Sequence, residues 1–390
     1  MYNFDEIIDR RGSGCIKYDC LKGNFGRDDL TPLWVADMDF RTPDFIVDAL
    51  KARMGHEIFG YVGIPDDYFP AIAAWVERLH GWKVAPEDIR YIPGIVKGIA
   101  LALECLVPKG GKVLIQPPVY YPFRNVPERM GYEVVTNPLK PVYDAEGFLT
   151  DYQMDFEDLE RKLDNGGDIG AIIISNPHNP CGIAWKAETL KRLAEIAGRY
   201  DVPVISDEIH CEMVLGGRTH VPYASVAGKD SRCITFMAPS KTFNIAGIVS
   251  SYAIIGNSGL RERFFSFLDA TEQDCPAIFP IVATKAAYTK GWEWRKQMLD
   301  YVQGNIDFVD SWFRNNLPQV RVVRPQASFL VWLDCRKTGF SHDELVGWFV
   351  DKARLALNDG AMFGAEGSGF MRLNVGCPRS VLEDSLKRLI

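Results

Sequence analysis

The sequence predicts an α/β protein, in which a large three-layer domain surrounds a mostly parallel central sheet and a smaller α+β domain is attached. Short apolar runs rich in Ile and Val recur from about residue 90, as expected of strands that are buried on both faces. Amphipathic stretches separate these runs, and such alternation is typical of parallel sheets. The 390 residues also exceed what one simple core holds, so a second domain is expected.

The strands of the sheet are expected in the middle of the chain. They are KVLIQ at 112–116, AIIIS at 171–175, VPVIS at 202–206, RCITFM at 232–237 and SYAII at 251–255. Among the intervening helices, residues 189–200 place Leu190, Leu193 and Ala197 on one face at helical spacing. A helix is therefore expected between the second and third of these strands.

The last third of the chain differs in pattern from the middle. Residues 285–317 are strongly helical, and residues 321–334 (RVVRPQASFLVWLD) resemble a pair of strands around Pro325. We therefore expect a large domain over 46–285 and a small domain formed by 1–45 together with 286–390. A cleft between the two domains would be available for a ligand.

The charge and composition favour a small polar substrate. The net charge is −7, and the lysines and arginines are dispersed among acidic residues, which argues against nucleic-acid binding. The first residues lack the basic-then-apolar order of a signal peptide, and no apolar run is long enough to cross a bilayer. We therefore expect a cytoplasmic protein with no nucleic-acid partner and no membrane partner.

The nine cysteines are scattered and include no CxxC pair. In a cytosolic chain this pattern favours free thiols over a disulfide framework or a zinc site. No metal site is expected.

Polar side chains follow four of the predicted strands. They are Tyr120 and Tyr121 after the first strand, Asn179 after the second, Asp207 and His210 after the third, and Ser240 and Lys241 after the fourth. In open α/β sheets, ligands bind just beyond the carboxyl ends of the parallel strands. Each residue alone has an ordinary structural explanation, such as a turn or a helix cap. Together and in this order they predict a ligand site.

The chemistry that uses such a set is catalysis by pyridoxal 5′-phosphate (PLP). A lysine amine, here Lys241, forms a Schiff base with the cofactor and then acts as the general base at the substrate Cα. A carboxylate, here Asp207, stabilises the protonated pyridine nitrogen. The Asn179 amide can donate to the phenolic oxygen O3′, and the Tyr120 ring can stack on the cofactor.

The cofactor phosphate requires backbone N–H groups at the positive end of a helix. Gly94, Ile95 and Val96 precede the helical pattern of residues 97–106, so the amides of Ile95 and Val96 are expected to bind phosphate. Ser240 could add a hydroxyl. The sequence contains neither GxGxxG nor GxxxxGK[ST], which argues against a nicotinamide or ATP site.

Several segments resemble those of a known family. SNPHNPCG, SDEIH and APSKTFNIAG are similar to segments of fold-type I PLP enzymes of the class I/II aminotransferase superfamily. More narrowly, PLWVADMDF at 32–40, FGYVGIPDDYF at 59–69 and FMRLNVGCPR at 370–379 resemble the MalY/PatB group of cystathionine β-lyases and cystalysin-like C–S lyases. The resemblance spans nearly the whole chain and implies the fold-type I PLP-dependent transferase fold.

The resemblance implies the same roles for Lys241, Asp207, Asn179 and Tyr120, and it places Asn179 near the substrate as well. It further implies that Tyr121 lies near the substrate and assists proton transfer. Arg372 would bind the substrate α-carboxylate, a contact suited to the planar fork of arginine. Ala36 would border that carboxylate. Tyr61 would reach the phosphate of the neighbouring subunit, so that the active unit is a homodimer.

Two positions depart from the pattern of the wider superfamily. Val249 stands where many relatives have a phosphate-binding arginine, so the phosphate would depend on backbone amides, Ser240 and Tyr61. His210 stands where a tyrosine often contacts O3′. Either a cofactor-binding role near Asp207 or simple packing would explain His210.

The expected reaction is β-elimination of L-cystathionine, L-cystine or a related S-substituted cysteine to pyruvate, ammonia and a thiol. Lys241 would remove the Cα proton, and Lys241 or Tyr121 would protonate the departing sulfur. The shared site also permits transamination, although no second arginine motif for a dicarboxylate is visible. The alternatives are therefore an aminotransferase of the same fold and a PLP-binding regulatory protein.

Overall fold

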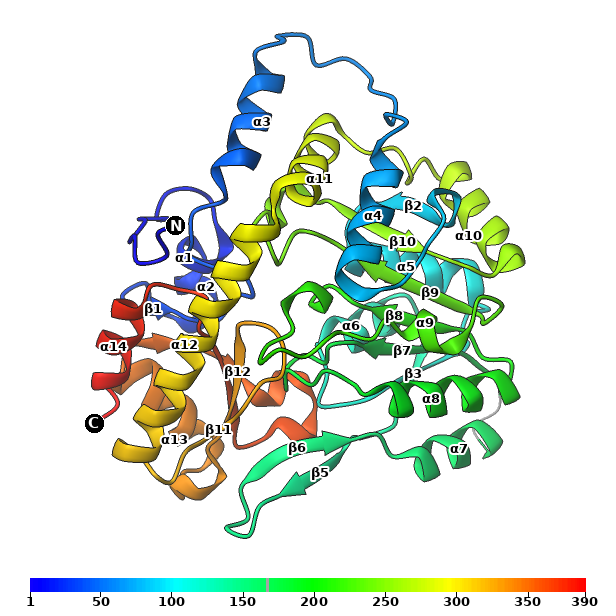
Figure 1. Ribbon diagram of the computed structural model, residues 1–390. Coiled ribbons are helices and arrows are strands. Elements are labelled where there is room, and N and C mark those ends of the chain that lie inside the picture. Colours follow the sequence, from blue (N-terminus) through cyan, green and yellow to red (C-terminus); the bar gives the residue numbers. More distant parts are fainter. Residues whose placement is uncertain (166–167) are drawn as a thin grey trace.

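A seven-stranded sheet forms the centre of the larger part of the protein. The computed structural model describes residues 1–165 and 168–390 (Figure 1). The sheet order is β2-β10-β9-β8-β7-β3-β4. Its strands are β2 (Ile89–Ile92), β3 (Lys112–Ile115), β4 (Glu133–Thr136), β7 (Ile169–Ser175), β8 (Val204–Asp207), β9 (Cys233–Met237) and β10 (Ser251–Ile254). All five predicted strands are confirmed. Only β10 breaks the parallel arrangement, because it runs antiparallel to both of its neighbours.

Helices cover both faces of this sheet and produce three layers. Alternate residues of each strand point to opposite faces, so Ile173 packs in one apolar cluster and Ile172 in another. The first cluster contains residues of α5 (Ile95–Leu106), α6 (Pro122–Arg129) and α10 (Ser258–Ala270). The second contains residues of α7 (Phe156–Asn165), α8 (Ala187–Arg199) and α9 (Tyr223–Ala227). Helix α8 confirms the helix predicted over 189–200.

The helical region predicted over 285–317 is divided at Gly291 into two helices. These are α11 (Ile278–Lys290) and the long α12 (Trp292–Asn316), which crosses the molecule in Figure 1. A Cβ at residue 291 would lie 2.3 Å from the Phe243 ring and from the Ala287 carbonyl oxygen. Only glycine fits this close approach between the helix junction and the segment after Lys241.

A second sheet of four antiparallel strands lies beyond α12, in the order β11-β12-β15-β14. Its strands are β11 (Arg321–Val323), β12 (Leu330–Asp334), β14 (Asn358–Asp359) and β15 (Phe370–Asn374). The pair β11 and β12 confirms the strand pair predicted around Pro325. Strand β1 (Thr31–Pro32) pairs with β13 (Leu355–Ala356), which joins the N-terminal segment to this region. These contacts support the proposed division into 46–285 and 1–45 with 286–390.

The remaining elements are short or peripheral. They are α1 (Ile16–Asp19), α2 (Leu21–Phe25), α3 (Asp44–Met54), α4 (Tyr68–His80), β5 (Lys140–Tyr143), β6 (Leu149–Gln153), α13 (His342–Gly347) and α14 (Arg379–Lys387). Within the described residues, no helix has the length and hydrophobicity of a membrane span, and no group of three or more metal-ligating side chains occurs. The nine cysteines are free thiols.

Candidate active site

A cavity of about 320 Å³ lies at the carboxyl ends of β7, β8 and β9, beside the first turn of α5. Eight of the predicted cofactor-binding residues line it, namely Ile95, Val96, Tyr120, Asn179, Asp207, His210, Ser240 and Lys241. Ala36 lines it too. Parallel strands bring their carboxyl ends to one edge of the sheet, which explains why residues spread over more than a hundred positions meet there.

Lys241 presents its amine to the loop that precedes α3. Its Nζ donates a hydrogen bond to the Ala36 carbonyl oxygen at 2.6 Å. Burial lowers the pKa of Lys241, which increases the neutral fraction of the amine. A neutral, positioned amine is the form that can act as a nucleophile or remove a proton.

Asp207 ends β8 and is 5% exposed. Its Oδ1 accepts a hydrogen bond from the Ile209 N–H at 3.0 Å. The described residues offer it no ion-pair partner. Burial raises the pKa of Asp207 to about 7. A cationic ring nitrogen in the cavity would restore the ionised carboxylate, because an opposite charge nearby favours the charged form.

Arg372 lies on β15 and is 3% exposed. Its Nη1 donates to Asn179 Oδ1 at 2.9 Å, so the amide NH₂ of Asn179 stays free for another acceptor. The Nε of Arg372 is buried without an acceptor, and burial lowers the pKa of its guanidinium to about 10. Arg372 does not line the cavity itself, but it contacts a residue that does.

The two tyrosines after β3 have different positions. The Tyr120 N–H donates to the Asn179 carbonyl oxygen at 3.0 Å, which joins two cavity segments. Burial raises the pKa of Tyr120, so its phenol stays protonated. Tyr121 is outside the cavity lining, with its ring 5.1 Å from the Tyr120 ring and 6.5 Å from the Phe363 ring. The structure therefore places Tyr121 at the rim of the site.

His210 is buried in the cavity wall and is held neutral. Burial lowers the pKa of His210 to about 3, and its Nδ1 has no hydrogen-bond partner. Its ring packs edge-on against Phe329, 6.4 Å between centroids. No hydrogen bond to Asp207 is formed in the described chain. The geometry thus favours packing, although the ring remains at the cavity surface.

The phosphate end of the cavity is formed by the start of α5. Gly94 precedes this 12-residue helix with φ of 105°, and no side chain caps it. The N–H groups of a first turn lack acceptors within their helix, so those of Ile95 and Val96 are available to an anion. Val249 also lines the cavity, in a left-handed conformation (φ 56°) that is strained for a β-branched residue.

Tyr61 is fully exposed, and its side chain makes no hydrogen bond or ring contact within the described residues. It lies in the segment 55–67 between α3 and α4, which projects from the molecule in Figure 1. Ile58, Phe59 and Val62 of the same segment are exposed as well. Exposed apolar side chains gathered in one segment are typical of interaction sites.

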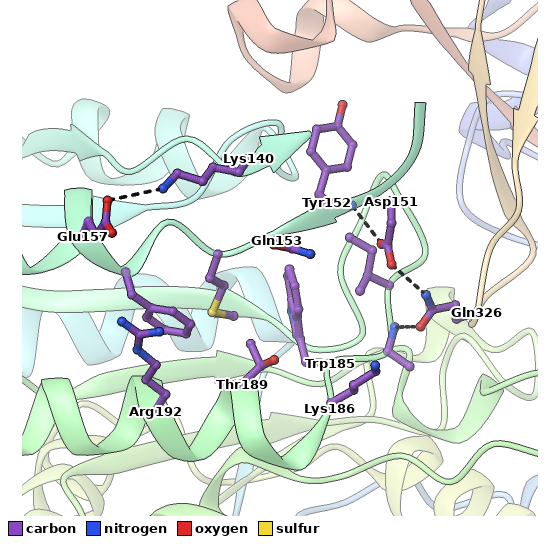
Figure 2. Close-up of a pocket in the computed structure, with 14 residues that line it drawn as sticks. Lys140, Asp151, Tyr152, Gln153, Glu157, Trp185, Lys186, Thr189, Arg192 and Gln326 are labelled. Carbon is purple, nitrogen blue, oxygen red and sulfur yellow. Dashed lines mark hydrogen bonds and ion pairs between the residues drawn. The ribbon is translucent and has the colours of Figure 1, made fainter. Parts of the chain in front are cut away.

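A second pocket, of about 390 Å³, contains none of the predicted site residues (Figure 2). Its Gln326 donates to Asp151 and accepts from the Ala184 N–H, while Lys140 points toward Glu157. These polar groups thus pair with one another. The amine, carboxyl and guanidinium of the first site have no charged partners, so we assign the candidate active site to the first cavity.

The groups that hold the Arg372 guanidinium, and the backbone that Lys241 contacts, were not predicted from the sequence. Arg372 Nη2 donates to the Trp34 carbonyl oxygen at 3.1 Å and to Asn358 Oδ1 at 2.5 Å. Asn244 donates to the Met38 carbonyl oxygen at 2.9 Å and so fixes the segment that contacts Lys241. Trp34 and Asn244 belong to segments that carry the family resemblance, whereas no motif in the sequence marks Asn358.

The polar groups of the site fit PLP. A buried amine, a buried carboxyl without a cation, a free amide donor and an uncapped helix start correspond to the aldehyde, ring nitrogen, phenolic oxygen and phosphate of that cofactor. An arginine with an unused N–H remains for a substrate carboxylate.

Comparison with known proteins agrees with this site. Residues 28–389 match the family model "Aminotransferase class I and II". The chain is 39% identical to "Cystathionine beta-lyase PatB" of Bacillus subtilis, over 99% of this chain and 98% of that protein. It is 32% identical to "Protein MalY" of Escherichia coli, over 100% and 98% of the two chains. The crystal structure of cystalysin from Treponema denticola, which contains PLP, superposes with a TM-score of 0.93 at 30% identity, covering 100% of this chain and 98% of that one. The chain therefore belongs to the PLP-dependent aminotransferase class I and II family and, within it, to the MalY/PatB group.

Proposed function

We propose that the protein is a PLP-dependent carbon–sulfur β-lyase that converts L-cystathionine, L-cystine or related S-substituted cysteines to pyruvate, ammonia and a thiol. The proposal depends on one observation: the buried Lys241 amine and the buried Asp207 carboxyl line the same cavity, and neither has an ion-pair partner among the described residues. The names of the relatives, a cystathionine β-lyase and cystalysin, support this choice of reaction.

PLP supplies a sink for the electron pair that is released when the Cα proton leaves. Lys241 acts as the general base for that proton, and its lowered pKa increases the neutral fraction of the amine, which is the form that can accept it. Asp207 keeps a proton on the pyridine nitrogen, and Asn179 donates from its free amide to the phenolic oxygen. Tyr120 offers an aromatic face to the ring.

The substrate is bound through its α-carboxylate by Arg372, near the backbone of Ala36 and the side chain of Asn179. Lys241 or Tyr121 protonates the sulfur as it leaves. The only cationic side chains that line the described cavity are Lys97 and Lys241. L-cystathionine and L-cystine themselves carry two carboxylates, so the choice of sulfur amino acids over other amino acids is supported by the names of the relatives rather than by the charge of this lining.

We propose a homodimer as the active unit, with Tyr61 reaching the phosphate of the neighbouring subunit. The exposed side chains of Ile58, Phe59 and Val62 around Tyr61 support this proposal, since a second copy would cover them. Within each subunit, the Ile95 and Val96 amides and the Ser240 hydroxyl bind the same phosphate. The free thiols favour a reducing, cytoplasmic location.

The deciding experiment is an assay of the holoenzyme with L-cystathionine and no added keto acid. A lyase releases pyruvate and homocysteine in equal amounts. Amino-group transfer that requires a keto acid would instead establish the aminotransferase alternative. Bound PLP without turnover of any sulfur amino acid would favour the regulatory alternative.

A further inference from the structure

The Arg372 guanidinium is held by neutral acceptors alone. Its Nη1 donates to Asn179, and its Nη2 donates to the Trp34 carbonyl oxygen and to Asn358 Oδ1. The Nε has no acceptor, and within the described chain Arg372 takes part in no ion pair. A buried cation without a counter-ion is costly, which is why burial lowers its pKa. The protein thus leaves this charge for an incoming anion.

Asn358 makes the shortest of these three contacts, at 2.5 Å. It is 5% exposed, and it lies directly opposite Arg372 in the antiparallel pair β14–β15. Directly opposed residues of antiparallel strands have neighbouring side chains, so the sheet register itself sets this contact. Asn358 is therefore fixed relative to Arg372 before any ligand binds.

The segment that follows Asn358 covers the flat face of the same guanidinium. The Arg372 Cζ lies 4.8 Å from the centre of the Phe363 ring, in a cation–π contact. The Phe363 carbonyl oxygen accepts from the Val119 N–H at 2.8 Å, which ties this segment to the loop of Tyr120 and Tyr121. Asn358 holds one edge of the guanidinium, and Phe363 holds its face.

We propose that Asn358 is a positioning residue for the substrate α-carboxylate. It orients Arg372 without neutralising it, because a carboxamide oxygen accepts a hydrogen bond but carries no charge. An aspartate at the same position has nearly the same shape, yet it would form an ion pair with Arg372 and compete with the substrate. This inference rests on one part of the proposed function, namely that the ligand is an α-amino acid.

The test compares Asn358→Asp and Asn358→Ala with the wild-type holoenzyme by titrating the absorbance of bound PLP. The two titrants are L-alanine, which has no leaving group at Cβ, and ethylamine, which lacks the carboxylate. We expect Asn358→Asp to weaken L-alanine binding by about tenfold or more, as for loss of a charge-assisted contact, with ethylamine changed less than about twofold. Asn358→Ala should weaken L-alanine binding by a smaller factor, since it removes orientation but adds no charge.

Met362→Leu is the matched control. The Met362 Sδ accepts weakly from Asn358 Nδ2 at 3.8 Å, so this substitution alters the surroundings of Asn358 and leaves the Arg372 contact intact. It should bind both titrants as the wild type does. Thermal unfolding of each cofactor-free variant identifies any loss of fold, and Asn358→Ala still tests the inference if Asn358→Asp does not fold.

The results separate this inference from the proposed reaction. Equal losses for L-alanine and ethylamine, or no loss for L-alanine in Asn358→Asp, would overturn the positioning role even if cystathionine is cleaved. A wild type that binds L-alanine but releases no pyruvate from cystathionine would overturn the lyase proposal alone. A wild type whose absorbance responds to neither amine would contradict the amino-acid site on which both depend.

Discussion

The Lys241 amine donates to the carbonyl oxygen of Ala36 at 2.6 Å, which joins two residues 205 positions apart. Asn374 donates to the carbonyl oxygens of Val35 and Asp37 at 2.6 and 2.7 Å, on either side of Ala36. The small sheet therefore holds the backbone that the lysine contacts. Because this backbone lies in the N-terminal segment, the positions of the amine and of the small sheet are coupled.

Lys241→Ala should remove the absorbance band of lysine-bound PLP and lower turnover by at least roughly 10³-fold, because both the nucleophile and the general base are lost. Absorbance spectra and pyruvate release measure the two effects. Lys140→Ala, in the pocket of Figure 2, is the control and should leave both unchanged. Persistence of the band in Lys241→Ala would show that another lysine holds the cofactor.

Asp207→Asn should keep the shape of the cavity but lower turnover by roughly 10²-fold or more, since an amide does not stabilise a protonated ring nitrogen. Steady-state kinetics at saturating PLP measures this effect. Asp207→Glu retains the charge, so its turnover should fall by a smaller factor than that of Asp207→Asn. Similar losses in both variants would indicate that cavity shape, rather than charge, is what Asp207 contributes.

The same residue predicts a pH dependence of stability in the cofactor-free protein. Burial raises the pKa of Asp207 from 3.8 to about 7, so the folded state binds this proton more tightly than the unfolded state. The resulting stabilisation is complete below about pH 4 and is lost as the pH rises through about 7. The free energy of unfolding of Asp207→Asn should therefore rise relative to that of the wild type by a few kcal/mol between about pH 4 and pH 8. Denaturant unfolding at each pH measures this difference.

His210 contributes a stabilisation that changes with pH in the opposite direction, because its lowered pKa means that the folded state binds the proton less tightly than the unfolded state. Both proteins retain His210, so its contribution cancels in the difference between them. A difference that does not vary with pH would contradict the raised pKa.

The central sheet was predictable because its strands are buried on both faces and are short, nearly continuous apolar runs in which Ile and Val are frequent. The direction of β10 was not predictable from that signal. Parallel neighbours need a crossover of a dozen or more residues, usually a helix. The segment 238–250 instead carries Lys241 and only the short helix η3 (Ala246–Ile248), so the chain returns antiparallel. The segment around the lysine lines the site and forms no crossover helix.

The side chains of the site were predictable for a similar reason. Lys241, Asp207 and Asn179 are unusual residue types at strand ends, and parallel topology brings strand ends together. The carbonyl oxygens of Trp34 and Ala36 were not predictable as acceptors, because every residue carries such a group. Asn358 acts through strand register, which no local pattern specifies across the 14 positions to Arg372.

Arg372→Lys should raise the KM for amino-acid substrates by roughly 10–100-fold while PLP binding stays unchanged, because lysine lacks the planar fork that binds a carboxylate at two points. Pyruvate release over a range of substrate concentrations gives KM, and absorbance titration gives the affinity for PLP. Arg336→Lys is a control just after β12 of the small sheet, since Arg336 pairs with Asp334 rather than with the site. An unchanged KM in Arg372→Lys would exclude Arg372 from carboxylate binding.

Mixed dimers test whether Tyr61 serves the neighbouring subunit. Tyr61→Phe removes one phosphate donor and should weaken PLP binding by roughly 10-fold or more, the usual cost of a hydrogen bond to a charged group. At limiting PLP, Tyr61→Phe and Lys241→Ala homodimers should each be nearly inactive. Coexpression of the two variants with different tags should recover about a quarter of wild-type activity, because one site in each mixed dimer combines an intact Lys241 with an intact Tyr61 from the other subunit.

The mixed species can be purified through both tags and compared with a dimer of Lys241→Ala and wild type. That dimer should retain about half of the activity, since one of its two sites has an intact lysine. If Tyr61 instead served its own subunit, the mixed dimer of the two variants would have no complete site and would remain inactive. The exposed position of Tyr61, on a segment that projects from its own chain, is the reason to expect recovery.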